Sequence, residues 1–334
     1  MTKKRGQQTL VFSVPPGIQA TAAIAGPKEG EGLLGSYYDK VMEDNLSGQD
    51  NWEKCESYMM EWAVKTVVQK SGLLMMDIDF LLAGDLLNQL IATNFAMRGI
   101  GRPFLGLYGA CSTMAESMLI GAMMLDGGFA NHIVAAVSSH HDTAERQYRY
   151  PTELGVQRPL IAQWTITASG AVVLQAESKG PKITSATIGK VVDFGVKDTN
   201  SMGPAMAPAA VDTLWQHFQD TGRQADYYDM IYTGDLGKVG KELVIRLMKE
   251  RGMDISNNYE DCGCMIYRED QDAHSGASGC ASSAAVLCAY LYPRLVAGHL
   301  KKILFIGTGS LHSTTSYQQK ESIPCIAHAV AVEI

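Results

Sequence analysis

Short apolar runs alternate along the chain with longer amphipathic segments, which is the pattern of an α/β fold. In the first half the pattern predicts strands at 21–25, 79–83, 104–108, 133–137 and 168–176, and helices at 52–70, 86–97 and 112–125. The order then starts again, with strands predicted at 183–192, 229–233, 303–306 and 327–332 and helices at 209–219, 238–249 and 281–296.

The two halves share a sequence signature as well as an order of elements. The pattern Asp-x-x-x-x-Gly-Asp-Leu occurs at 79–86 and again at 229–236, each time where a predicted strand ends and a helix begins. Self-similarity of this kind indicates a duplicated unit. We therefore expect two related halves, 1–178 and 179–334, that share an interface and a cleft at the carboxyl ends of their strands.

Composition narrows the classes of partner. The 334 residues are 46% hydrophobic and carry a formal net charge of −7, and the only basic run, Lys3-Lys4-Arg5, lies near the amino terminus. Nucleic-acid binding is therefore not expected. The longest apolar runs, 118–125 and 281–289, are shorter than the roughly 20 residues of a membrane span. We expect a soluble chain that reaches a membrane only through partners or a surface patch.

The cysteines do not suggest a disulfide framework or a metal site. There are seven, an odd number, and no charged and apolar leader precedes them, so reduced thiols in the cytoplasm are expected. Cys262 and Cys264 have no second pair at zinc-ligand spacing. In the run 140–142, His-His-Asp, adjacent side chains do not converge on one ion, so a structural role such as capping a strand end is favoured and no metal is expected.

Cys111 is the strongest candidate for chemistry. It lies between the strand predicted at 104–108 and the helix predicted at 112–125. The first turn of a helix presents unpaired N–H groups and the positive end of the peptide dipoles, which lower the pKa of a thiol. Such a cysteine can attack a carbonyl or form the floor of an anion-binding pocket, and a small core residue is the plain alternative.

Arginines and aromatic residues gather after the fourth strand. The run 146–150, Arg-Gln-Tyr-Arg-Tyr, and Arg158 supply forked donors and ring faces, and Pro151 and Pro159 are expected to keep the segment an irregular loop. We expect one of these arginines, with Arg146 and Arg149 as candidates, to reach a pocket. A solvated or subunit-interface loop remains the alternative for each.

The duplicated pattern, Cys111 and the turn His274-Ser-Gly-Ala-Ser-Gly279 before a small-residue helix resemble the thiolase and ketosynthase superfamily. This resemblance implies an α/β thiolase-like fold with duplicated five-layer α-β-α-β-α architecture, and a homodimer formed by extension of the sheet. More narrowly, GACSTMAES, the segment 138–174 and GTGSLHSTTS resemble the stage V sporulation protein AD family.

For the superfamily, the resemblance implies a cysteine nucleophile, two polar partners from the second half and a glycine-rich turn at an oxyanion pocket. Cys111 matches the nucleophile, His274 the distal histidine and Gly307-Thr-Gly309 the turn. A second histidine would follow the strand at 229–233, where this chain has Thr233-Gly234-Asp235. A carboxylate disfavours a thiolate, so condensing activity is not expected. Because Asp85 occupies the same place in the first repeat, Asp235 is interpreted as a helix N-cap.

The narrower resemblance implies a catalytically idle protein that binds pyridine-2,6-dicarboxylate (dipicolinate). It also implies a peripheral place at the spore inner membrane, with membrane proteins of the assembly that moves dipicolinate during sporulation and germination. The ligand-binding candidates are Cys111, His274, Gly309, Arg146, Arg149 and Thr233. No cofactor is expected, and calcium would arrive only as the chelate of the ligand. The alternative is an acyltransferase that uses Cys111 to accept an acyl group from coenzyme A or a carrier protein.

Overall fold

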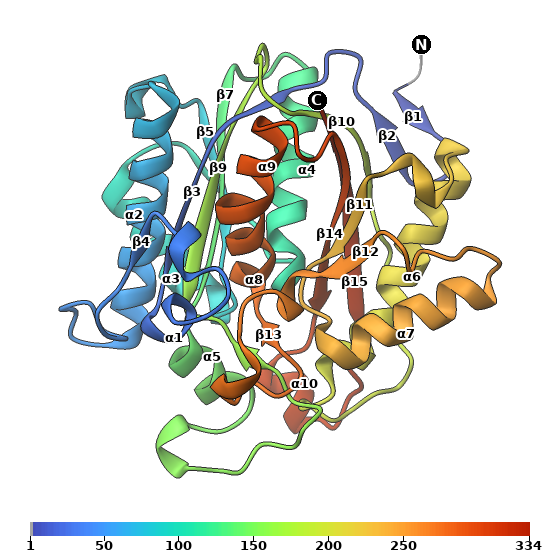
Figure 1. Ribbon diagram of the computed structural model, residues 1–334. Coiled ribbons are helices and arrows are strands. Elements are labelled where there is room, and N and C mark those ends of the chain that lie inside the picture. Colours follow the sequence, from blue (N-terminus) through green and yellow to red (C-terminus); the bar gives the residue numbers. More distant parts are fainter. Residues whose placement is uncertain (1–2) are drawn as a thin grey trace.

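The computed structural model, which describes residues 3–334, is built around one long mixed β-sheet (Figure 1). Its first half contains β3 (Gly17–Ala25), β5 (Phe80–Gly84), β6 (Phe104–Gly106), β7 (His132–Ser139) and β9 (Ala168–Gln175). Its second half contains β10 (Lys182–Thr187), β11 (Met230–Thr233), β12 (Tyr259–Asp261), β14 (Lys302–Ser310) and β15 (Cys325–Glu333). Short strands complete it: β1 (Lys4–Arg5), β2 (Thr9–Val11) and β4 (Lys40–Val41), with a separate pair formed by β8 (Trp164–Thr165) and β13 (Ala277–Ser278).

The two halves repeat one topology. The strand order β3-β9-β7-β5-β6 in the first half corresponds to β10-β15-β14-β11-β12 in the second, with antiparallel and parallel neighbours in the same places. The halves are joined where Lys182 of β10 pairs with Gly17 of β3.

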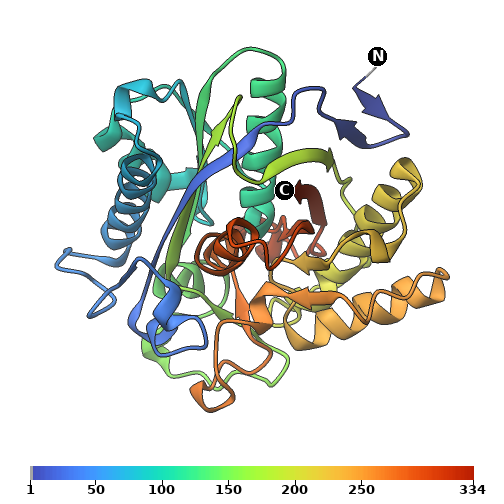
Figure 2. The same cartoon turned by 45° about the horizontal axis from the view of Figure 1, so that its top comes forward.

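Helices form three layers around the two halves of the sheet (Figures 1 and 2). The outer layers are α2 (Trp52–Ser71) with α3 (Ile91–Ile100), and α6 (Met202–Thr221) with α7 (Gly237–Glu250). The central layer contains α4 (Thr113–Asp126) and α8 (Cys280–Val286), which continues through a π-helical turn (Leu287–Leu291) into α9 (Tyr292–Val296). The remaining helices are short: α1 (Pro27–Gly30), α5 (His141–Tyr148) and α10 (Thr314–Gln318). The predicted five-layer fold is confirmed.

Small residues allow the central helices to pack closely on the sheet. A Cβ added to Gly170 of β9 would lie 2.8–3.0 Å from atoms of Ala284 in α8, and one added to Gly121 of α4 would lie 2.8 Å from the side chain of Leu174. Backbones this close exclude larger side chains. The small residues of 281–289 are therefore explained by the burial of this segment between the two halves of the sheet.

Asp79 and Asp229, the first residues of the repeated signature, make equivalent hydrogen bonds in the two halves. Asp79 accepts hydrogen bonds from the backbone N–H groups of Asn131 and His132, where β7 begins. Asp229 accepts equivalent bonds from Lys301 and Lys302, where β14 begins. Each carboxylate therefore aligns two neighbouring parallel strands.

Several predicted elements differ from the structure; for example, the helix predicted at 209–219 begins at Met202, and the strand predicted at 183–192 ends at Thr187. The segment expected to be an irregular loop from residue 146 is helical up to Tyr148, because His140 caps α5 by accepting from the N–H of Asp142 at 3.3 Å. The helix predicted at 86–97 begins only at Ile91, after two residues in left-handed conformation. The helix predicted at 281–296 contains the π-helical turn just before Pro293. A proline ring clashes with the preceding turn of a regular α-helix and has no N–H to donate.

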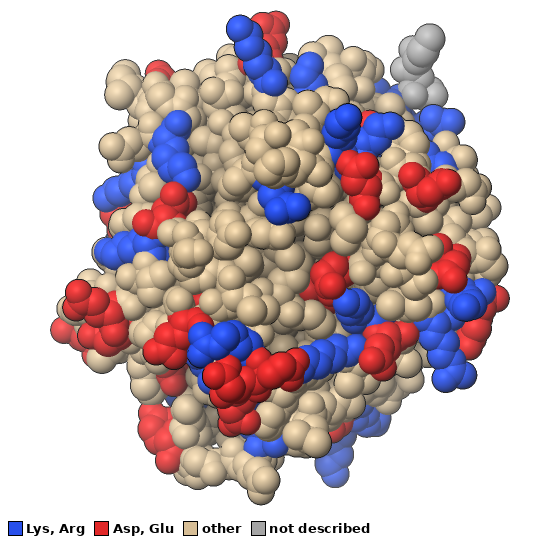
Figure 3. All heavy atoms as spheres, in the orientation of Figure 1, with Lys and Arg blue, Asp and Glu red and all other residues tan. Residues whose placement is uncertain are grey.

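On the face seen in Figure 3, basic and acidic side chains lie intermixed, and neither sign forms a continuous field. Within residues 3–334, no helix has both the length and the apolar character that a bilayer span requires.

Candidate functional site

Cys111 lies on a strained turn at the start of α4. Ala110 before it has φ of +49°, a left-handed conformation that is rare for a residue with a side chain. Hydrogen bonds hold the turn, with the Ser112 hydroxyl donating to the Gly109 carbonyl at 2.7 Å and the Thr113 hydroxyl to the Ala110 carbonyl at 2.6 Å. The backbone therefore fixes the direction of the Cys111 side chain.

The segment predicted as a glycine-rich turn, 307–309, lies inside strand β14, and it packs directly on the turn that carries Cys111. A Cβ on Gly309 would lie 2.2 Å from the Gly109 carbonyl oxygen, and one on Gly307 would lie 2.8 Å from the Ser112 carbonyl oxygen. Gly309 thus allows β14 to approach Cys111 closely.

The predicted activation of the Cys111 thiol is wrong. Burial is the main reason that its pKa lies well above the usual value, and the Asp235 carboxylate raises it further through its charge and a hydrogen bond with the thiol. The N–H of Gly279 acts in the opposite direction, but more weakly. Cys111 is therefore a neutral thiol at neutral pH.

Asp235 is not the helix cap that its place in the repeat indicated. Its carboxylate accepts from the Thr308 hydroxyl at 2.8 Å and the Gly279 N–H at 2.9 Å, and burial raises its pKa to about 6. Asp261 instead caps α7, accepting from the N–H groups of Leu236 and Gly237 at 2.9 Å each. The second-half aspartate is thereby directed at Cys111.

Replacing Asp235 by asparagine is expected to lower the pKa of Cys111 and speed its alkylation by iodoacetamide about tenfold near pH 8, because one negative charge beside the thiol is removed. Peptide mapping by mass spectrometry measures the rate. Cys55 and Cys288, buried elsewhere, serve as internal controls and should keep their rates. An unchanged Cys111 rate contradicts the electrostatic role of Asp235.

A small inner chamber opens beside Cys111. Its volume is about 20 Å³, and its walls include Cys111, Tyr148, Arg149, Met202 and His312. A space of this size holds about one water molecule. The nucleophile position of the fold is therefore present, but the chamber leaves no room for an acyl chain in this conformation.

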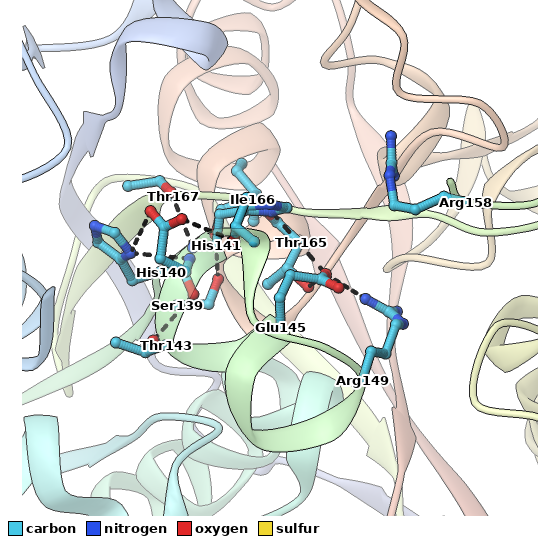
Figure 4. Close-up of polar contacts among 12 residues, drawn as sticks. Ser139, His140, His141, Thr143, Glu145, Arg149, Arg158, Thr165, Ile166 and Thr167 are labelled. Carbon is cyan, nitrogen blue, oxygen red and sulfur yellow. Dashed lines mark hydrogen bonds and ion pairs between the residues drawn. The ribbon is translucent and has the colours of Figure 1, made fainter. Parts of the chain in front are cut away.

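A larger outer cavity of about 270 Å³ lies next to the inner chamber. Its walls include Arg149, Arg158, Trp164, His141 and Glu145, and Arg149 also lines the inner chamber. In Figure 4, Glu145 points toward Arg149 and Thr165, while Arg158 stands on a separate segment without a drawn partner. Arg149 is therefore the wall shared by the two cavities.

Trp164 gives the outer cavity an aromatic wall with positive charge over it. The imidazole of His141 stacks on Trp164, with ring centroids 3.7 Å apart and planes 6° apart. The Lys28 ammonium lies 3.9 Å and the Arg158 guanidinium 4.6 Å from the centre of the Trp164 ring. Burial lowers the pKa of His141 to about 3, so this imidazole is neutral.

The cations of the outer cavity are incompletely neutralised. Arg149 forms an ion pair with Glu145, whereas Arg158 donates from Nη2 to the Asp272 carbonyl at 2.7 Å and its buried Nη1 has no partner. Burial, and next the charge of Arg158, lower the pKa of Lys28. The cavity therefore favours an anion over a cation or a neutral ligand.

The structure brings together only some of the predicted site residues. Cys111 and Arg149 line one chamber, and Gly309 packs behind it. Arg146 points away and pairs with Glu53, and the hydroxyl of Thr233 is bonded to Tyr259 and Asp261 at 2.7 Å each.

His274 lies outside the inner chamber. Its Nδ1 lies 3.0 Å from the Pro159 carbonyl oxygen and its Nε2 lies 2.8 Å from the Asp272 carboxylate, on the wall of a neighbouring surface hollow. The expected meeting of His274 with Cys111 does not occur.

Several residues that form the two cavities were missed, among them His312 and Trp164. Both His312 and Trp164 fall inside segments that carried the family resemblance, and this was the one signal that pointed to them. In the described part of the chain, no cluster of three or more His, Cys, Asp or Glu side chains is arranged to hold a metal ion. His140 fills its hydrogen bonds with backbone, its Nε2 lying 2.8 Å from the Asn45 carbonyl oxygen.

Comparison with known proteins agrees with this architecture. A family model described as "Stage V sporulation protein AD (SpoVAD)" matches residues 6–333. Stage V sporulation protein AD of Bacillus subtilis (strain 168) is 48% identical over 331 residues, which are 99% of this chain and 98% of that protein.

Solved structures share the fold at low identity. The 3-oxoacyl-[acyl-carrier-protein] synthase III of Aquifex aeolicus VF5 has a TM-score of 0.57 and 11% identity, with 96% of this chain and 100% of that chain covered. A variant of OleA from Xanthomonas campestris has a TM-score of 0.64 and 14% identity, with 97% and 98% covered. These likenesses show a thiolase-like condensing-enzyme fold and nothing about activity.

Proposed function

Because the chain belongs to the stage V sporulation protein AD family, we propose that it binds dipicolinate in the outer cavity and serves a spore membrane assembly that moves this ligand. The membrane proteins of that assembly would be its partners, and the chain would attach peripherally to the spore inner membrane. Calcium would enter only as the chelate of the ligand. The proposal is supported by the chemistry of the outer cavity.

The observation that carries the proposal is Arg158, which lines the outer cavity and whose Nη1 has no hydrogen-bond partner. A buried donor without a partner costs about 1–3 kcal/mol, so Arg158 is expected to gain an acceptor when the cavity is occupied. A carboxylate suits the fork of a guanidinium. The volume of about 270 Å³ is just below the range of pockets for drug-sized ligands, which matches a single ring with two carboxylates.

Isothermal titration calorimetry of the purified protein tests the proposal directly. Dipicolinate is expected to bind with one site per chain. Isophthalate, which keeps both carboxylates but lacks the ring nitrogen, and picolinate, which has one carboxylate, are expected to bind more weakly. Absence of heat with dipicolinate contradicts the proposed function.

We also propose a homodimer formed through β6, which ends the sheet in the first half. Leu105 of β6 is 48% exposed and Phe95 of the adjacent α3 is 50% exposed, an apolar strip beside an unpaired strand edge. Exposed edges of this kind are sites of strand pairing.

Leu105→Lys is expected to convert the dimer into the 36.2 kDa monomer, because a charge would be buried at the paired edge. Sedimentation velocity measures the mass. Leu74→Lys, at another exposed leucine, is the matched control and should remain dimeric. A monomeric wild type, or a dimeric Leu105→Lys, contradicts this interface.

Acyl transfer from a thioester to Cys111 is the second candidate function. The strained turn at Ala110, which fixes the direction of the Cys111 thiol within a condensing-enzyme fold, favours it. The raised pKa of the thiol leads us to expect no stable adduct after incubation with a panel of acyl thioesters, as read by intact-mass spectrometry. An adduct on the wild type that is absent from Cys111→Ser would place acyl transfer first.

A further inference from the structure

His312 is a buried, poorly paired imidazole. It follows β14, is 4% exposed and lines the inner chamber beside Cys111. Neither ring nitrogen has a partner at good hydrogen-bond geometry, although the Ser310 backbone acts on the imidazole as a hydrogen-bond partner that raises its pKa, and the ring lies 5.1 Å from that of Tyr148. Most buried polar groups in folded proteins are paired, so this poorly paired imidazole in the chamber wall points to a polar occupant of the chamber.

Arg149 presents a second poorly paired donor to the same chamber. Its Nη1 is paired with Glu145 and its Nε donates to the Thr199 carbonyl at 3.3 Å. The acceptor for Nη2 is the sulfur of Met202 at 3.6 Å, and a thioether is a weak acceptor. Arg149 and His312 therefore offer two donors across a space that fits one water molecule or one carboxylate oxygen.

We propose that the inner chamber is a second carboxylate subsite in which the distal carboxylate of the diacid accepts from Arg149 Nη2 and from His312, and that His312 takes up a proton as this carboxylate enters. The inference rests on the proposed function, because the first carboxylate and the ring occupy the outer cavity. Arg149, the shared wall, turns from Met202 to the ligand oxygen.

The charges around His312 explain why a proton would be taken up. Tyr148 and Arg149 face it from the end of α5, Tyr108 from the segment after β6, and Cys111 from the turn before α4. Burial raises the pKa of both tyrosines and of Cys111, so these groups stay neutral and Arg149 is the one charge lining the chamber. Beyond them, Glu145 is paired with Arg149, and Asp235 acts on Cys111.

Without a ligand, His312 is neutral near pH 7. Burial and then the charge of Arg149 lower its pKa to about 4. A carboxylate in hydrogen-bond contact favours the imidazolium and raises the pKa of His312 in the complex. The complex then holds more protons than the free protein, so affinity rises as pH falls between the bound and the free pKa, by at most tenfold per pH unit.

Calorimetry in two buffers with different protonation enthalpies counts the protons. Wild type is expected to take up between about half and one proton near pH 6, with affinity rising about two- to tenfold from pH 7 to pH 6. Picolinate, which lacks the distal carboxylate, is expected to bind with no uptake, and this comparison needs no variant. His312→Gln is expected to bind dipicolinate without proton uptake and without the pH slope.

His328→Gln is the matched control. His328 lies in β15, is buried like His312, and has a pKa that burial lowers to about 4, but it lines neither cavity. It is expected to keep wild-type uptake. Dipicolinate heat without proton uptake, or uptake that survives in His312→Gln, overturns the subsite and leaves the proposed function standing. No heat at all overturns both.

Discussion

Replacing Arg158 by glutamine is expected to weaken dipicolinate binding about 100-fold. The variant keeps a donor in the wall of the outer cavity but loses the charge and the unpartnered Nη1 of Arg158. Removing one member of a buried, charged hydrogen-bonded pair costs about 2–5 kcal/mol, and 100-fold corresponds to about 2.7 kcal/mol at the lower end of that range. Calorimetric titration of the variant and the wild type in the same buffer measures the ratio.

Arg146→Gln is the matched control for this substitution. Arg146 also follows β7, but it pairs with Glu53 at the surface and lines a different hollow. The affinity of Arg146→Gln for dipicolinate should stay within about twofold of that of wild type, as expected when an exposed ion pair is lost. Equal losses in both variants would mean that general positive charge, and not the Arg158 contact, attracts the ligand.

Gly309→Ala is expected to lower the free energy of unfolding by about 3 kcal/mol or more. The added Cβ would lie 2.2 Å from the Gly109 carbonyl oxygen and 3.0 Å from the Ser112 nitrogen, both of them backbone atoms that cannot turn aside. Either β14 or the turn that carries Cys111 must move, and overpacking against rigid neighbours is strongly destabilising. Urea unfolding followed by circular dichroism measures the change.

Gly99→Ala provides the comparison for this prediction. Gly99 lies in the exposed last turn of α3, where a Cβ would meet only the flexible end of Glu61 at 3.0 Å. Alanine is the better helix former, so this variant should be neutral or more stable by up to about 1 kcal/mol. A Gly309→Ala protein as stable as Gly99→Ala would show that the contact between β14 and the cysteine turn is not rigid.

Most of the fold could be predicted because periodicity and repetition are properties of the sequence itself. The predicted α2 and α4 differ from the observed helices by one residue at each end or less, since both are long and end at clear signals such as Gly72. The start of α5 depended on a cap from the ring of His140, a residue type that does not mark a helix start in sequence. Two prolines nearby therefore made the segment look irregular.

The site was harder to predict than the fold because its chemistry depends on burial. A helix start favours a thiolate in isolation, but desolvation and Asp235 dominate once the chain is folded, and neither is visible in a local pattern. The same holds for Thr233 and His274, because their positions in a motif did not reveal which neighbours would form hydrogen bonds with their side chains. Arg149 was one of several arginine candidates, and its place in the walls of two cavities appears only in three dimensions.

Asp85 and Asp235, which occupy the same place in the two halves, form hydrogen bonds with different neighbours. Asp85 accepts from the N–H groups of Leu87, before α3, and of Thr93, in its first turn, so its loss would loosen that helix. In the second half Asp261 holds the start of α7, and Asp235 instead accepts from Thr308 and Gly279 beside Cys111. A substitution at position 235 can therefore change the chemistry of the Cys111 thiol while the cap of α7 stays in place.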